Sequence, residues 1–298
     1  MKGVIFVMVA CLFWAFDTLI RYPLIGSYSV EKIIFYEHLL LAAIFVPVIW
    51  KRRSIWWEFK VDHLFSFLVI GGLGSALGSI CFTASFKLIN PSLVILLQEL
   101  QPIVAIVLAR LVLKEEIQKK FLLWAIPCIV GGLLVSHKGL LTYLQAGDFS
   151  NILSAASLKG YGLALSAVFC WGTATVFGKK LSSSGVDEKD IMAGRFFIGL
   201  MVMVPFFFQA PSPLILGSVV DYGKIVLLAV LSGLIAMTFY YQGLKRISAR
   251  LCALVEMFFP FCAVAINWLF LDASLDGIQL LGGALLIVGS AVIQLRHY

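Results

Sequence analysis

The chain has 298 residues, of which 61% are hydrophobic and only 13% are charged, and its mean hydropathy is +1.00. This balance lies far outside that of soluble globular domains, so it excludes a soluble fold and indicates an integral membrane protein. The formal net charge of +7 is compatible with nucleic acid binding or with an excess of Lys and Arg on one side of a membrane.

Ten segments of about 20 mostly apolar residues, the length that a helix needs to cross a bilayer, follow one another along the chain. The loops between them are short, so no soluble domain is expected. Barrel strands alternate apolar and polar residues over about ten positions, whereas these segments are apolar throughout, and the expected fold class is therefore all-α. The predicted spans are 3–20, 30–50, 64–86, 91–113, 120–138, 160–179, 190–209, 223–244, 250–271 and 277–295.

The two halves of the chain resemble each other. CLFWAFDT (11–18) aligns with VFCWGTAT (168–175), and SFKLINPS (85–92) aligns with GLKRISAR (243–250). Each half therefore contains five of the predicted spans. Because an odd number of spans turns the second copy upside down in the membrane, the sequence predicts two inverted repeats.

The distribution of Lys and Arg supports this inversion. Four of these residues lie in the loop after the second span, within 51–60, whereas the matching segment FQAPSP (208–213) contains none. If both termini are cytoplasmic, 15 Lys and Arg residues lie inside and six outside, and Arg110 and Arg195 lie within spans. Membrane topology thus explains the net charge, and no nucleic acid partner is expected.

This arrangement resembles the drug/metabolite transporter superfamily, specifically its EamA type. The resemblance covers essentially the whole chain. It is carried by a tryptophan near the middle of the first helix of each repeat, by GRFFIGLMVMVP (194–205), and by the bend at a proline in the fourth and ninth spans. It implies a first five-helix repeat at residues 1–145 and a second, inverted one at residues 155–298.

The resemblance also implies that the fifth and tenth spans lie at the periphery and that the other eight surround a central cavity. The glycine pairs at 131–132 and 282–283 in these two peripheral spans are interpreted as points of close helix packing. The sequence departs from the family pattern at two positions. Gln101 stands where an acid is often found, and His38 stands where the second repeat has Arg195.

Four acids within the predicted spans are candidates for function: Asp17, Glu37, Glu99 and Glu256. A charge near the bilayer centre costs at least about 2.5–3.5 kcal/mol on insertion scales, so each should face a cavity or a partner. Glu99 and Glu256 lie near mid-depth, and we expect them to bind a cationic group, a proton or both; the alternative is that they only fix helix packing. Glu37 and His38 point about 100° apart on a helix, so at most one is expected to face the cavity squarely.

Proton coupling is expected at one or more of Glu99, Glu256 and His38. For His38 the alternative is a packing residue whose nitrogens are hydrogen-bonded. Pro102 and Pro260 predict bends, because each removes a backbone hydrogen bond. The carbonyl groups freed by these prolines could accept hydrogen bonds from a substrate if they face water.

Aromatic and amide residues are expected to complete an aromatic-walled, partly anionic pocket that suits an amine-bearing metabolite. Each aromatic residue alone is equally typical of packing or of anchoring at the membrane surface. The predicted cavity residues are Trp14, Asp17, Tyr36, Phe82, Gln98, Glu99, Gln101, Trp171, Tyr240, Tyr241 and Glu256.

No motif for an enzyme, a cofactor or a metal site was found. The six cysteines all fall in predicted spans without CxxC or Cys/His spacing, so they are expected to be reduced packing residues, and no metal site is predicted. HExxH, GxSxG and P-loop motifs are lacking as well. We therefore expect neither an enzyme nor a cofactor.

The sequence thus predicts a secondary transporter that moves a small metabolite across a bacterial inner membrane by alternating access. An amino acid or a related amphipathic, amine-bearing compound is the expected substrate, and export is the direction that the resemblance implies. The alternatives are a proton-coupled multidrug or cation efflux carrier and, less favoured, a passive channel or scramblase. Expected partners are the small-molecule substrate and membrane lipids, with a homodimer as a further option.

Overall fold

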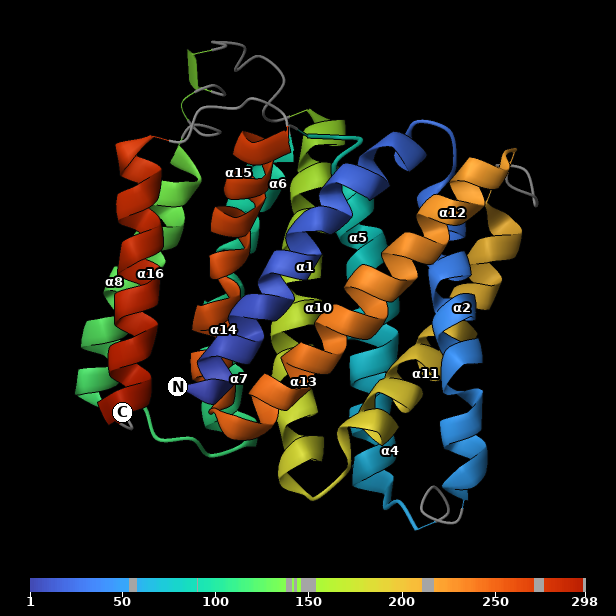
Figure 1. The fold of residues 1–298 in the computed structure, drawn as a ribbon, viewed down its shortest axis with the longest axis horizontal. Coiled ribbons are helices and arrows are strands. Elements are labelled where there is room, and N and C mark those ends of the chain that lie inside the picture. Colours follow the sequence, from blue (N-terminus) through green and yellow to red (C-terminus); the bar gives the residue numbers. More distant parts are fainter. Residues whose placement is uncertain are drawn as a thin grey trace.

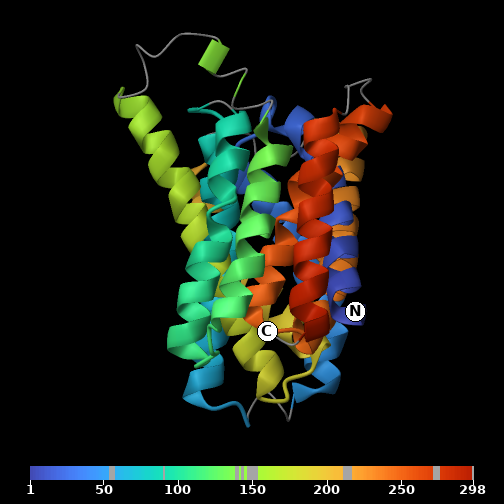
Figure 2. The same ribbon diagram turned by 90° about the vertical axis from the view of Figure 1, so that its left-hand side faces the viewer.

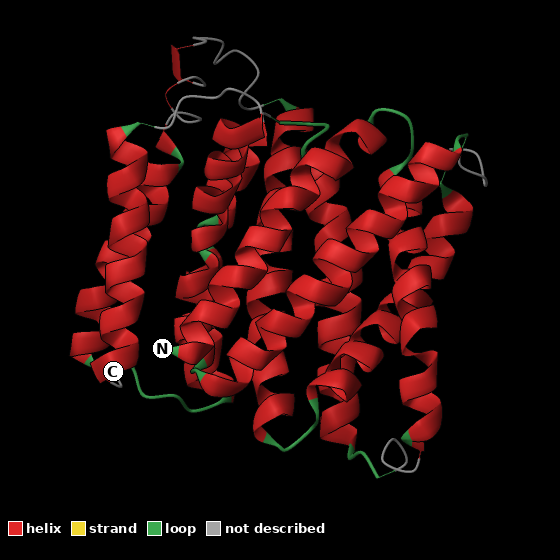
Figure 3. Ribbon diagram, viewed as in Figure 1, coloured by secondary structure: helices red, strands yellow, loops and turns green. Residues whose placement is uncertain are grey.

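The computed structural model describes residues 1–53, 58–89, 91–137, 141, 144–145, 154–210, 217–270 and 276–296. Every regular element in this part of the chain is helical, and the helices form one bundle (Figure 3). The expected all-α fold class is thus confirmed for the described residues. Both termini lie at the same end of the bundle (Figure 1).

The first half of the chain contains eight helical elements in the described residues. They are α1 (Lys2–Ile25), α2 (Val30–Lys51), α4 (Val61–Leu68), the π-helical η1 (Val69–Leu77), α5 (Gly78–Ser85), α6 (Pro91–Gln98), α7 (Gln101–Val112) and α8 (Lys119–Val135). Elements α4, η1 and α5 follow one another without a break and form one long helical segment.

The second half contains a similar series. It consists of α10 (Ala155–Ser183), α11 (Glu188–Gln209), α12 (Val219–Leu228), the π-helical η2 (Ala229–Ala236), α13 (Met237–Arg246), α14 (Ala249–Glu256), α15 (Phe258–Phe270) and α16 (Gly277–Arg296). Four of these helices begin at a side chain that accepts a hydrogen bond from a backbone N–H of the first turn, as N-caps do. The capping residues are Ser154, Asp187, Ser218 and Ser248.

Eight helices of the described residues are long and apolar enough to cross a membrane. These are Lys2–Ile25, Val30–Lys51, Val61–Ser85, Ala155–Ser183, Glu188–Gln209, Val219–Arg246, Ala249–Ile266 and Gly277–Arg296. The other two predicted spans contain shorter helices. The span 91–113 is divided between α6 and α7 just before Pro102, and α8, in the span 120–138, has 17 residues.

Helices α8 and α16 pack against each other at one side of the bundle (Figures 1 and 2). Their backbones approach closely at Gly131 and Gly282. A Cβ atom added at Gly131 would lie 2.6 Å from the carbonyl oxygen of Gly282, and one added at Gly282 would lie 2.5 Å from that of Gly131. Only residues without a side chain permit this approach, as expected for small residues at helix interfaces in membranes.

Gly131→Ala is therefore expected to destabilise the protein by about 1–3 kcal/mol, because the added methyl group meets backbone that cannot move aside easily. Gly162→Ala on α10 is the matched control, since a Cβ atom added there meets nothing within 4 Å and alanine favours the helix. Thermal unfolding followed by tryptophan fluorescence would compare the two. Equal unfolding temperatures for both variants would contradict the close contact of α8 with α16.

Ion pairs join the two halves of the chain at the end of the bundle that carries both termini. Glu115, which pairs with Arg250, also accepts hydrogen bonds from the backbone N–H groups of Ala249 and Arg250, at 2.9 and 3.4 Å. These N–H groups belong to the first turn of α14 and have no acceptor within the helix. These contacts hold the two halves together at this end. The ion pairs are Arg52–Asp190 (2.9 Å), Arg52–Asp187 (3.7 Å), Lys180–Asp62 (2.6 Å) and Arg250–Glu115 (3.5 Å).

Candidate functional site

A central cavity of about 230 Å³ lies between the two halves of the chain. Its walls come from α1, α2, η1, α5, α6 and α7 of the first half and from α10 to α15, with η2, of the second half. Among the described residues of α8 and α16, none lines the cavity. The position of these two helices outside the cavity wall matches what the family resemblance implies for the fifth and tenth spans.

Most of the predicted cavity residues lie in this wall, and His38 does as well. Two aromatic pairs contribute to it: the ring centroids of Phe82 and Trp171 are 4.8 Å apart, and those of Trp14 and Tyr240 are 5.4 Å apart. The predicted residues in the wall are Trp14, Asp17, Phe82, Gln98, Gln101, Trp171, Tyr240 and Glu256. Tyr36, Glu99 and Tyr241 are not among the lining residues.

The three other predicted residues have different surroundings. Tyr36 packs in an aromatic cluster, where its ring centroid is 5.8 Å from that of Phe207 and 6.5 Å from that of Tyr222. Tyr241 is fully buried, and its hydroxyl accepts a hydrogen bond from Arg195 Nη1 at 3.1 Å. It therefore contacts the cavity wall from behind.

Glu99 points away from the cavity, toward α8. A Cβ atom added at Gly132 would lie 2.4 Å from Glu99 Oε2 and 2.6 Å from Met257 Cε. In the alignment of the two repeats, Glu99 corresponds to Met257, and Gln98 corresponds to Glu256. The structure follows this correspondence, because Gln98 and Glu256 both line the cavity. A shift of one residue turns a side chain by about 100° around the helix, which accounts for the different direction of Glu99.

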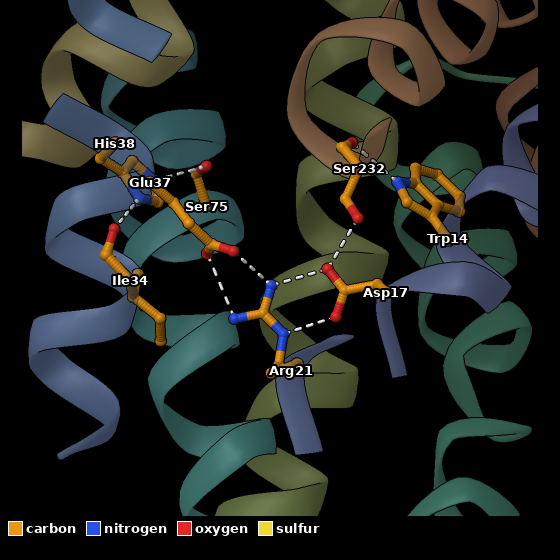
Figure 4. A network of polar contacts seen from close by, with 8 residues as sticks. All are labelled: Trp14, Asp17, Arg21, Ile34, Glu37, His38, Ser75 and Ser232. Atoms are coloured by element: carbon orange, nitrogen blue, oxygen red, sulfur yellow. Dashed lines mark hydrogen bonds and ion pairs between the residues drawn. The ribbon is translucent and has the colours of Figure 1, made fainter. Parts of the chain in front are cut away.

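Arg21 lies between two of the acids, on the cavity wall (Figure 4). Its guanidinium donates to Asp17 at 2.5 and 2.7 Å and to Glu37 at 2.8 and 3.2 Å. Ser232 Oγ also donates to Asp17 Oδ2 at 2.7 Å, and the carbonyl of Ser232 accepts from Trp14 Nε1 at 3.3 Å. Two carboxylates thus share one guanidinium, and the second half of the chain contacts this cluster through η2.

The sequence analysis missed Arg21, because the first span was expected to end at residue 20. The helix α1 continues to Ile25, so Arg21 lies inside the bundle. One signal was available: Asp17 and Arg21 are four residues apart, the spacing at which opposite charges meet on a helix. The length and hydropathy of the segment ended the predicted span one residue before this second charge.

His38 and Glu37 both line the cavity, although at most one of them was expected to face it squarely. They do so in different directions: Glu37 binds Arg21, whereas His38 binds Ser75 of η1 (Figure 4). His38 Nδ1 lies 2.8 Å from the carbonyl oxygen of Ile34, which can only accept, so this nitrogen carries a hydrogen. Nε2, 2.9 Å from Ser75 Oγ, then accepts the hydroxyl hydrogen in a neutral ring.

Glu256 is bound by side chains from both halves of the chain. Its carboxylate accepts from Gln101 Nε2 at 2.6 Å and from Thr175 Oγ1 at 3.2 Å, and Cys252 Sγ donates at 3.5 Å. The Thr175 hydroxyl is also 2.9 Å from the hydroxyl of Tyr240. Glu256 is therefore a hydrogen-bonded acid in the cavity wall, at the point where the two halves meet.

The helices are interrupted close to both predicted bends. In the first half α6 ends at Gln98 and α7 begins at Gln101; in the second half α14 ends at Glu256 and α15 begins at Phe258. The carbonyl of Glu256, which Pro260 leaves without its helical donor, accepts from Cys11 Sγ at 3.7 Å. This carbonyl thus faces α1, where the thiol of Cys11, which was expected only to pack, donates a hydrogen bond to it.

No candidate metal site is present in the part of the chain that the structure describes. No group of three or more His, Cys, Asp or Glu residues is placed there to hold a metal ion, and all six cysteines are free. The cavity therefore offers charged, hydroxyl and aromatic groups for binding.

Comparisons with known proteins point to one family. A model of the EamA-like transporter family matches residues 1–137 and 158–295. The riboflavin transporter ImpX of Fusobacterium nucleatum is 28% identical over 303 residues, covering 96% of this chain and 95% of ImpX. The uncharacterised transporter YyaM of Bacillus subtilis is 22% identical, with 92% and 88% covered. Protein PecM of Dickeya dadantii is 24% identical, with 78% and 75% covered.

A solved crystal structure resembles the fold as a whole. The superposition includes 99% of this chain and 97% of the chain in that structure. The TM-score is 0.75, and the sequences are 15% identical. At this identity the likeness shows the fold alone.

Proposed function

The chain belongs to the EamA-like transporter family and is a multi-pass membrane protein, and we propose that it is a secondary transporter that works by alternating access. The observation that carries this proposal is the central cavity, which both halves of the chain build and which combines aromatic walls with buried charges. Charged side chains within spans are costly, so they are expected to line a substrate pathway or to pair with a partner. The cavity is accordingly proposed as the substrate site.

The proposed architecture is ten spans in two inverted five-helix repeats, residues 1–145 and 155–298. Two pairs of features support it. Helix interruptions occur near Pro102 and Pro260, and π-helical stretches occur in the third and eighth predicted spans, as η1 and η2. Rare π-helical turns are often found at functional sites, and both stretches contribute cavity residues.

The proposed location is a bacterial inner membrane with both termini in the cytoplasm, on the distribution of Lys and Arg. The ion pairs between the halves, such as Arg52–Asp190, would then close the cytoplasmic end of the bundle. Alternating access requires these pairs to separate when the two repeats rock against each other.

A homodimer is also proposed for the membrane-embedded protein, and its mass in detergent by light scattering would test it.

The proposed substrate is a small amphipathic metabolite. Amino acids and other amine-bearing compounds are the first candidates, because Asp17, Glu37 and Glu256 line an aromatic cavity. Riboflavin is a second candidate, because the relative ImpX is named as a riboflavin transporter and aligns over nearly its whole length. Export is the proposed direction.

The test is transport by the purified protein in liposomes, with labelled amino acids, polyamines and riboflavin as the panel. We expect saturable uptake of at least one compound, and accelerated uptake when the same compound fills the vesicles, because a carrier exchanges substrate across the membrane. Empty vesicles are the control. Flux that neither saturates nor shows this exchange would favour a passive channel or scramblase, and exchange of hydrophobic cations alone would favour a multidrug carrier.

A further inference from the structure

We infer that Arg195 forms a carboxylate-binding pole of the central cavity, and that the transported molecule carries a carboxylate. The inference rests on the proposed function, since it assigns a chemical group to the substrate of the same cavity. Among the proposed candidates it favours amino acids, which carry a carboxylate, over polyamines and riboflavin, which do not.

The surrounding helices hold Arg195 firmly in the cavity wall. It lies on α11 and is only 9% exposed. A Cβ atom added at Gly71 would lie 2.7 Å from the carbonyl oxygen of Arg195, and one added at Gly74 would lie 3.8 Å from Arg195 Nη1. Gly71 of η1 thus lets α11 approach closely, and Gly74, whose added Cβ atom would lie 2.3 Å from Cβ of Ala174, lets α10 approach the same segment.

The guanidinium of Arg195 is incompletely bound. It offers five N–H donors. Nη1 donates to the hydroxyl of Tyr241 at 3.1 Å, while Nε is buried without an acceptor among the described residues. No ion pair within this part of the chain involves Arg195. Because a buried charge without a counter-ion is costly, the site favours an anion that comes from outside the chain.

The other charged groups in the cavity wall are already engaged. The donors of Arg21 are taken by Asp17 and Glu37, so Arg21 has little capacity for a further anion. Glu256 is an acid and so cannot attract an anion; it accepts hydrogen bonds from the side chains of Gln101, Thr175 and Cys252. Among the described lining residues, Arg195 is therefore the cation that lacks an acidic partner.

A carboxylate is the group that this site fits best. The planar fork of a guanidinium binds the two oxygens of a carboxylate side by side. Glu256, elsewhere in the same wall, could hold an ammonium group. Thr175 joins Glu256 to Tyr240 by hydrogen bonds, and the ring of Tyr240 contacts the ring of Tyr241, which binds Arg195. A cavity with poles of both signs suits a molecule with a carboxylate and an amine better than a cation.

Three probes with the same ring test this inference on the purified protein: 3-phenylpropionate, phenylalanine and phenethylamine. Isothermal titration calorimetry should show that the wild type binds the first two. Arg195→Gln should weaken the affinity for both carboxylates by about tenfold to a hundredfold, the range for a charge-assisted hydrogen bond. The affinity for phenethylamine should be the same in the variant and the wild type. Arg195→Lys should keep part of the affinity, because it keeps the charge without the fork.

Arg110→Gln is the matched control, since Arg110 is exposed on α7, outside the cavity. Equal unfolding temperatures of Arg195→Gln and the wild type would show that the loss is not a loss of fold. Absence of 3-phenylpropionate binding by the wild type, or undiminished binding by Arg195→Gln, would overturn the inference. Carboxylate binding that depends on Arg195, without any transport in liposomes, would instead overturn the proposed function and leave the assignment of the carboxylate site to Arg195 standing.

Discussion

Glu256→Gln is expected to lose transport driven by a proton gradient and to keep the exchange of substrate for substrate. The carboxylate of Glu256 lies in the cavity wall and binds Gln101 and Thr175, which come from opposite halves of the chain. Glutamine has nearly the same shape but cannot take up or release a proton. Exchange requires no net movement of protons, so a folded variant should still perform it.

The measurement is uptake into liposomes with and without a pH gradient, using whichever compound of the panel the wild type transports. Gradient-driven uptake by Glu256→Gln should fall to the level of empty vesicles, while exchange keeps a rate comparable with that of the wild type. The other titratable groups near Glu256 are Cys252, at 3.5 Å, Tyr240, which reaches it through Thr175, and Cys11, whose thiol donates to the backbone carbonyl of Glu256.

Glu99→Gln and His38→Gln are the matched comparisons for proton coupling. Glu99 faces Gly132 on α8 rather than the cavity, and both ring nitrogens of His38 are hydrogen-bonded when the ring is neutral. Both variants should therefore keep their response to the gradient. If Glu256→Gln responds to the gradient like the wild type, Glu256 does not carry the proton, and loss of the response in either comparison variant would identify the carrier.

Arg21→Gln is expected to lower the free energy of unfolding by about 3 kcal/mol, near the lower end of the range for a buried ion pair that loses one partner. The substitution leaves Asp17 and Glu37 next to each other without their shared cation. The side chains of the three residues are 10–17% exposed, so water entering through the cavity screens the repulsion only partly. The cost comes from two carboxylates that remain buried.

Thermal unfolding in detergent would measure this loss, with Arg110→Gln as the control for removing an exposed arginine. The triple variant Asp17→Asn, Arg21→Gln, Glu37→Gln should regain most of the stability, because it removes all three charges together. An unfolding temperature of Arg21→Gln equal to that of the wild type would contradict the role of Arg21 as the shared cation. A triple variant as unstable as Arg21→Gln would show that hydrogen bonding, rather than charge, dominates the cluster.

Several features of the site followed from the sequence because they depend on local chemistry. A proline removes one backbone hydrogen bond of a helix, so Pro102 and Pro260 indicated where the chain is interrupted between α6 and α7 and between α14 and α15. The sequence did not show that α1, α2, α8 and α11 would continue through their own prolines. The alignment of the halves placed Gln98 opposite Glu256, and both residues line the cavity. Tyr36 and Tyr241 were less predictable, because an aromatic ring suits a cavity wall and a packed interface equally well.

The sequence was sufficient to identify an all-helical membrane protein, because its segments are too long and too uniformly apolar for barrel strands, and helices satisfy their own backbone hydrogen bonds in a bilayer. The tertiary structure decided how the charges pair. Arg21 lies between Asp17 and Glu37, Glu99 turns toward α8, and Arg195 is left without an acid. Each pairing depends on how one helix is rotated against its neighbour. The hydropathy of a single helix does not predict that rotation.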